Sequence, residues 1–107
     1  MTSFDDRQDK FENRFAHDAK LKFKAEARRN KMLGLWAAEL MGKSGDEADA
    51  YAKEVIMSDL EEAGDEDVFR KIRGDFDAAG IEQSDHQIRR HMDEFLAKAV
   101  DEIQNEG

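Results

Sequence analysis

The sequence SDHQIRRHMDEFLAKAVDEIQ (residues 84–104) carries the clearest structural signal in the chain. Apolar residues recur along it every three or four positions, which places them on one face of an α-helix. Ser84 precedes this pattern and Gln87 follows three residues later, the spacing at which two side chains cap a helix N-terminus. We therefore predict a helix at about residues 85–104 that packs one face against the rest of the chain. The members of that face are Ile88, Met92, Phe95, Leu96, Ala99, Val100 and Ile103.

Three further segments show helical periodicity, at about residues 18–41, 46–63 and 66–79. A glycine follows each of them, as is common where helices end. The chain contains no proline and no stretch with the alternation of a strand. We predict an all-α fold, a small irregular four-helix bundle that occupies residues 18–107. In the first segment the expected buried stripe consists of Leu21, Ala25, Met32, Leu33, Trp36 and Leu40.

Gly34 lies inside the first predicted helix. A glycine there costs about 1 kcal/mol relative to alanine. We interpret it as the point where another helix crosses closely.

The composition describes a single polar domain. The chain has 107 residues, 40% of them charged, with a mean hydropathy of −0.87 and no cysteine. It has no apolar run of the roughly 20 residues that span a bilayer, and no basic-then-apolar signal region at its start. We expect a cytoplasmic protein without membrane insertion.

The net charge of −9 is unevenly distributed. Residues 1–31 contain nine Lys/Arg and six Asp/Glu, a net +3, whereas residues 32–107 contain eight and twenty, a net −12. An acidic body argues against nucleic-acid binding and gives no sign of self-association, so we expect a monomer when free. The basic segment has two interpretations. It pairs with acidic faces of its own bundle, or it binds phosphate groups of a nucleotide or RNA, with Phe23 among the cations. The cations are Lys20, Lys22, Lys24, Arg28, Arg29 and Lys31.

The first fifteen residues, MTSFDDRQDKFENRF, form a narrow aromatic seam on a charged segment. Phe4, Phe11 and Phe15 lie within about 40° of one another on a helical wheel. An isolated helix of that length is marginal in water. We predict an N-terminal arm, residues 1–17, that is disordered or partly helical when free and becomes ordered on a partner. The alternative is that the three rings pack onto the bundle as an extra helix.

Catalytic and metal-binding patterns are missing from the sequence. His86 and His91 lie about 140° apart on a helix, which does not form a common metal face. His17 stands alone, and we expect solvated or capping roles for all three histidines. The sequence has no phosphate-binding glycine loop and no calcium-binding loop. We predict a protein that is not an enzyme and holds no metal.

Three segments of the chain resemble a known family. FDDRQDKFENRFAHDAKLKFKAEARRNKMLGLWAAELMG (Phe4–Gly42) is similar to the start of the zeta subunit, the inhibitor protein of F-type ATP synthases in alpha-proteobacteria. The similarity continues through AYAKEVIMSDLEEAG and SDHQIRRHMDEFLAKAV, so that it covers nearly the whole chain.

The resemblance implies a four-helix fold with a mobile N-terminal arm. It also implies that the arm enters a catalytic α/β interface of the ATPase head, beside the rotating central stalk (the γ subunit), and blocks rotation and ATP hydrolysis. The protein would then be peripheral to the inner membrane through the synthase. No cofactor is required, although some members of the family are thought to bind ATP or ADP weakly. The residues carried over as partner-binding are Phe4, Asp5, Asp6, Arg7, Lys10, Phe11, Arg14 and Phe15.

Overall fold

A computed structural model describes residues 19–59 and 65–106 of the chain. These residues form four α-helices joined by turns, and none of them lies in a strand. The predicted all-α, four-helix fold is therefore confirmed. The predicted N-terminal arm, residues 1–17, lies outside the described residues. The helices are α2 (Ala19–Leu40), α3 (Asp46–Ser58), α4 (Glu66–Ala79) and α5 (Asp85–Glu106).

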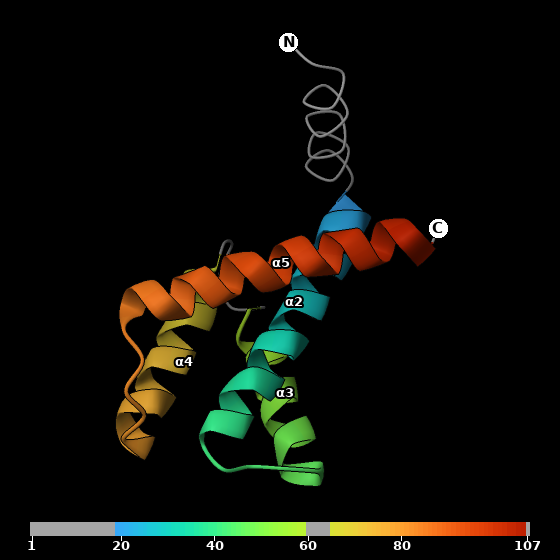
Figure 1. Cartoon of the computed structure of the whole chain (residues 1–107). Helices are drawn as coiled ribbons and strands as arrows, with labels where there is room; N and C mark the ends of the chain where they lie inside the picture. Colours follow the sequence, from blue (N-terminus) through green and yellow to red (C-terminus); the bar gives the residue numbers. More distant parts are fainter. Residues whose placement is uncertain (1–18, 60–64, 107) are drawn as a thin grey trace.

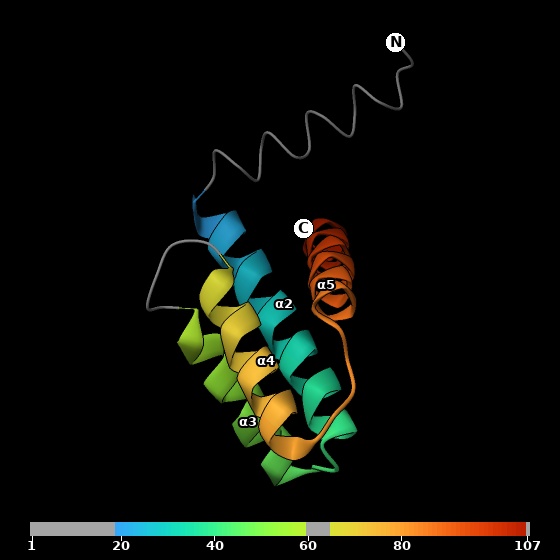
Figure 2. The ribbon, with the colours of Figure 1, turned by 90° about the vertical axis from the view of Figure 1, so that its left-hand side faces the viewer.

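Helix α2 is the central element, because it packs against each of the other three helices. Figures 1 and 2 show α2, α3 and α4 lying side by side, with α5 running across α2 at a steep angle. The bundle is irregular because α5 crosses α2 steeply instead of lying alongside it. The C-terminal end of α5 reaches the N-terminal half of α2, so segments from opposite ends of the described chain lie together.

The main core lies where α2, α3, α4 and α5 meet. Its largest fully buried side chains include Leu33, Val55, Ile72 and Phe76. The predicted stripe of α2 is only partly correct, because Leu40 is 37% exposed. Helix α2 contacts three other helices, so its buried residues lie on more than one face. A prediction that assumes one apolar stripe therefore misses some of them, such as Ala37 and Ala38. The remaining buried core residues are Ala37, Ala38, Tyr51, Val68, Ile88 and Met92.

At Gly34, α2 and α3 approach each other closely. A Cβ atom built on Gly34 would lie 2.7 Å from the Cα atom of Ala52 and 3.3 Å from a methyl group of Val55. Real Cβ atoms do not come this close to backbone, so the two helices can meet here only because residue 34 has no side chain. The predicted close helix crossing is confirmed.

The predicted cap of the last helix is also confirmed. The backbone N–H of Gln87 donates to the Ser84 hydroxyl oxygen (3.1 Å), and the backbone N–H of Ser84 donates to the Gln87 side-chain oxygen (2.8 Å). This reciprocal pair fixes the start of α5, which continues to Glu106, two residues beyond the predicted end. Helix α3 ends at Ser58, and residues 60–63 of its predicted range lie outside the described residues.

Candidate functional site

The first candidate is the basic segment of α2, residues 20–31, which we call the neck. One side of the neck carries Lys24 and Arg28, which face the last turn of α5. A guanidinium nitrogen of Arg28 lies 2.7 Å from Oε1 of Glu106 and 3.5 Å from a carboxylate oxygen of Glu102. The ammonium group of Lys24 lies 3.4 Å from the other Glu106 oxygen. The hydrogen bond from Arg28 lowers the pKa of Glu106 below its ordinary value.

A small apolar cluster lies beneath these ion pairs. Ala25 of α2 and Ile103 of α5 are buried against each other, and half-buried apolar residues surround them. Exposed ion pairs contribute little to stability by themselves, since water screens them. The apolar contact and the carboxylates together hold the N-terminal half of α2 against α5.

The other side of the neck contains a buried polar cluster at the end of α3. Arg29 is 3% exposed and Asn30 is 1% exposed. Nε of Arg29 donates to the side-chain oxygen of Asn30 (2.8 Å). The amide group of Asn30 donates to a carboxylate oxygen of Asp59 (3.0 Å), and a guanidinium nitrogen of Arg29 lies 3.9 Å from the same oxygen. These contacts join α2 to the residue that follows α3.

Five of the six neck cations divide into two groups. Lys24, Arg28 and Arg29 pair with carboxylates of their own bundle, as one interpretation of the charge asymmetry expected. Lys22 and Lys31 are exposed and make no ion pair within the described part of the chain. Phosphate binding by the neck stays a prediction. Sequence reasoning did not identify the burial of Arg29, because nothing in the local spacing separates a buried arginine from an exposed one.

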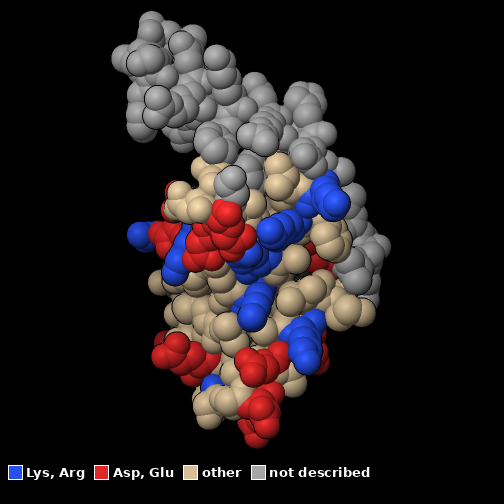
Figure 3. All heavy atoms as spheres, turned by 90° about the vertical axis from the view of Figure 1, so that its right-hand side faces the viewer, with Lys and Arg blue, Asp and Glu red and all other residues tan. Residues whose placement is uncertain are grey.

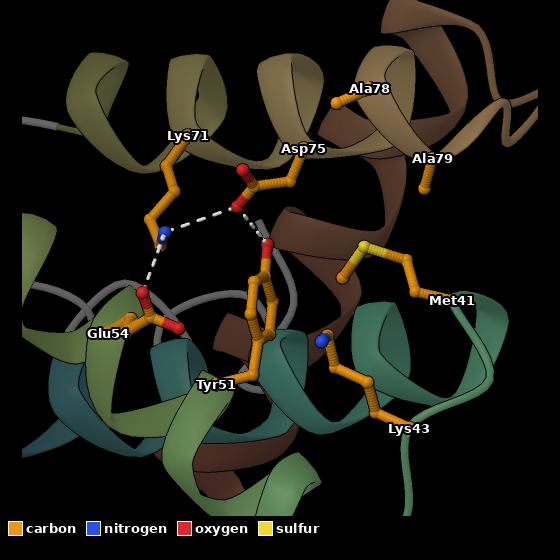
Figure 4. A pocket seen from close by; sticks show the side chains of 8 residues that line it. All are labelled: Met41, Lys43, Tyr51, Glu54, Lys71, Asp75, Ala78 and Ala79. Atoms are coloured by element: carbon orange, nitrogen blue, oxygen red, sulfur yellow. Dashed lines mark hydrogen bonds and ion pairs between the residues drawn. The ribbon is translucent and has the colours of Figure 1, made fainter.

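The second candidate is a hollow of about 380 Å³ between α3 and α4, which no sequence pattern indicated (Figure 4). The hydroxyl group of Tyr51 donates to a carboxylate oxygen of Asp75 (2.7 Å). The ammonium group of Lys71 lies 3.1 Å from the same oxygen and 3.8 Å from a carboxylate oxygen of Glu54. Burial, followed by the hydrogen bond to Asp75, raises the pKa of Tyr51 well above its ordinary value of 10.

The polar groups of this hollow have a structural role. Tyr51 keeps its proton at neutral pH and acts as a hydrogen-bond donor, and the charge of Lys71 is balanced by two carboxylates. The contacts of Tyr51 with Asp75 and of Lys71 with Glu54 hold α3 against α4.

The third candidate is an aromatic cluster around Trp36. The rings of Trp36 and His91 stack with their centroids 4.1 Å apart and an interplanar angle of 18°. Phe76 and Phe95 meet Trp36 edge-on. Nδ1 of His91 lies 2.9 Å from the carbonyl oxygen of Gln87, at hydrogen-bonding distance. His91 thus packs against the core, and neither of its predicted roles, solvated or capping, describes it.

Among the described residues, no group of His, Cys, Asp and Glu side chains is arranged to hold a metal ion. No helix in the described ranges has the length and apolar character that crossing a membrane requires. The predicted partner-binding residues, which begin at Phe4 and end at Phe15, lie outside the described residues.

The described residues thus define a small all-α protein whose polar groups mainly serve to fasten its helices together. A family model described as ATPase inhibitor subunit zeta matches residues 1–102. The chain belongs to this family, which confirms the resemblance found in the sequence. Its role is accordingly regulatory, in association with the ATP synthase.

One solved structure that the chain resembles is a solution NMR structure of a protein that is 49% identical to it. The match covers 81% of this chain and 99% of that chain, with a TM-score of 0.71. No curated protein matches the chain.

Proposed function

We propose that the chain inhibits ATP hydrolysis by the F-type ATP synthase through its N-terminal arm, residues 1–17, which enters a catalytic α/β interface of the head beside the central stalk. The observation that carries this proposal is that the family match begins at residue 1 and runs to residue 102. The arm is therefore part of what the chain shares with an inhibitor family, and is not an unrelated extension of the helical body.

The pattern of the arm suits a helix that binds in a groove. Such helices bind through apolar anchors spaced by helical turns, which Phe4, Phe11 and Phe15 supply. Burying each ring contributes about 1.5–3 kcal/mol, whereas ordering the backbone costs about 1–2 kcal/mol per residue. The charged residues between the rings must therefore add contacts of their own, and the arm must begin from a structure that is already ordered.

The helical body supports the proposal by supplying that starting structure. Helix α2 begins at Ala19, and its first half is held by the contact of Ala25 with Ile103 and by the ion pair of Arg28 with Glu106. Helix formation is limited by nucleation, and extending an existing helix avoids that step. A fixed neck thus lowers the free-energy cost of ordering the arm on the ATPase head.

The direct test changes the arm while leaving the body intact. In the full-length chain, Phe11→Ala combined with Phe15→Ala should raise the concentration for half-inhibition of ATP hydrolysis about tenfold or more, because anchor residues dominate binding energy. The matched control is Met57→Ala, which truncates an apolar side chain that is 61% exposed on α3 and far along the chain from the arm. Far-ultraviolet circular dichroism should show unchanged helicity of the body in both proteins.

The outcomes are distinct. A double variant that inhibits as strongly as the unaltered chain contradicts the arm mechanism. An unaltered chain that binds the head without slowing hydrolysis contradicts the inhibitory function itself.

A further inference from the structure

Phe23 is an exposed aromatic side chain within the neck. Its side chain is 60% exposed, and the residues on either side of it, Lys22 and Lys24, are exposed as well. Lys20, one turn before it, is also exposed. A single exposed apolar side chain is common on protein surfaces, so the neighbours of Phe23 decide whether this one is functional.

The exposure of Phe23 follows from the short length of α3. At 100° per residue, Phe23 lies on the same face of α2 as Asn30 and Gly34, within about 20° of each. Helix α3 covers that face at Gly34, where Ala52 touches it, and at Asn30, which binds Asp59 just after the helix ends. The 13 residues of α3 reach no further along the 22 residues of α2, so neither α3 nor Asp59 after it covers the same face at Phe23.

Helix α5 does not cover Phe23 either. It packs on Ala25, which lies about 160° around α2 from Phe23. At the level of Phe23, therefore, α2 is packed against α5 on one side and exposed on the other. Because α2 is held in place here, binding through Phe23 would order little more than the Phe23 side chain itself. The entropy cost of binding is then small, which favours affinity.

The charge around Phe23 indicates the chemistry of a partner. Residues 20–31 contain six Lys/Arg and one acidic residue, Glu26. Three of these cations, Lys24, Arg28 and Arg29, already pair with carboxylates of the bundle. Figure 3 shows one face of the molecule, on which Lys and Arg side chains run across the centre and along the right, with one group of Asp and Glu beside them at the upper left and others toward the lower end. Lys22 makes no ion pair within the described residues. An acidic partner surface would complement this part of the neck and be repelled by the lower end.

We propose that Phe23 and Lys22 form a second contact with the inhibited ATPase, in which the ring enters an apolar notch and Lys22 faces a carboxylate beside it. This inference rests on the proposed function. The arm ends at residue 17 and α2 begins at Ala19. With a rise of about 1.5 Å per residue, Phe23 lies about 6 Å along the helix axis from that start. The partner that holds the arm is thus the surface nearest to Phe23. The two contacts together orient the helical body on the head.

The first test compares two equally exposed apolar side chains. Phe23→Ala should raise the concentration for half-inhibition about tenfold, as is typical of an aromatic anchor at an interface. Phe23→Leu should lie between that variant and the unaltered chain. Met57→Ala should leave inhibition unchanged, because Met57 has nearly the same exposure but lies on α3, where its neighbours one turn earlier are Lys53 and the acidic Glu54. The thermal midpoints should stay the same, since neither side chain is part of the core.

The second test concerns the charge. Lys22→Glu should slow association with the head by about tenfold at low salt, and added salt should reduce the difference. The matched control is Lys53→Glu on α3, an exposed lysine whose replacement changes the net charge by the same amount. Equal effects of the two variants would show a general response to net charge and overturn the proposed contact.

Failure of this inference differs from failure of the proposed function. If the unaltered chain inhibits and Phe23→Ala inhibits equally well, the second contact is absent and the arm mechanism stands. If the unaltered chain does not inhibit, both proposals fall. If Phe23→Ala leaves inhibition unchanged but abolishes self-association, or binding to vesicles of anionic phospholipid, the surface serves another occupant and the inference is overturned.

Discussion

Gly34 offers the sharpest test of the packing. Replacing it with alanine places a Cβ atom 2.7 Å from the Cα atom of Ala52, a contact that only a shift of the α3 backbone can relieve. Overpacking of this kind costs about 1–3 kcal/mol. The higher helix propensity of alanine returns about 1 kcal/mol. We expect Gly34→Ala to lower the free energy of unfolding, by about 1 kcal/mol near the middle of these ranges.

Gly74 provides a matched control. It also lies inside a helix, but it is exposed, and no atom lies within 4 Å of the position where its Cβ would be. Gly74→Ala should therefore raise the free energy of unfolding by about 0.5–1 kcal/mol through helix propensity alone. In a domain of this size each kcal/mol shifts the thermal midpoint by about 4–8 °C. Calorimetry should thus find the midpoints of the two variants on opposite sides of that of the unaltered chain.

A third variant locates the contact. Adding Ala52→Gly to Gly34→Ala removes the Ala52 Cβ atom, which lies 3.2 Å from the new methyl group, but leaves the Cα atom at 2.7 Å. Stability should remain below that of the unaltered chain. If Gly34→Ala stabilises the protein as much as Gly74→Ala does, the close approach of α2 and α3 does not exist and the reasoning is refuted.

Three further predictions concern helix capping and titration. Ser84→Ala should destabilise the protein by about 1 kcal/mol in urea unfolding, because it removes the cap of α5; Ser84→Thr should retain most of it, and equal losses would contradict the capping role. The hydrogen bond to Arg28 lowers the pKa of Glu106 below its ordinary value of 4.5, so this contact should persist at pH 4.5 and be lost as the pH falls further. Amide hydrogen exchange in the neck should then rise at a higher pH than exchange in the main core does. Glu106→Gln should remove this pH dependence of exchange in the neck. Tyr51 is the sole tyrosine and its pKa is raised, so above pH 10 the unfolded chain releases a proton that the folded chain keeps, and stability should fall as the pH rises further; phenolate absorbance that appears near pH 10 in the folded protein would contradict the buried contact with Asp75.

The sequence predicted the helices well because their signals are local. Periodicity and the Ser84–Gln87 spacing depend on residues within a few positions of one another, and both agree with the structure. Glycines follow α2 and α4 as predicted, whereas α3 ends at Ser58 and Gly64 lies outside the described residues. Gly34 was equally informative, since a glycine inside a helix has few explanations other than a close neighbour.

Features that depend on which helices meet could not be read in this way. Arg29 is buried and Phe23 is exposed, the reverse of what residue type suggests. Both follow from where α3 ends along α2, which no local pattern encodes. The stacking of His91 on Trp36 likewise joins residues on different helices. The partner-binding residues rest on the resemblance to a family, and they stay predictions.

The hydrogen bonds from Lys24 and Arg28 to Glu106 span 82 and 78 residues of sequence. During translation the N-terminus leaves the ribosome first, and domains complete folding only when their last element has emerged. The start of α2 is thus held by the last turn of the helix that is synthesised last. A chain that lacks its last few residues would keep the central core but lose the ion pairs that hold the first half of α2 against α5.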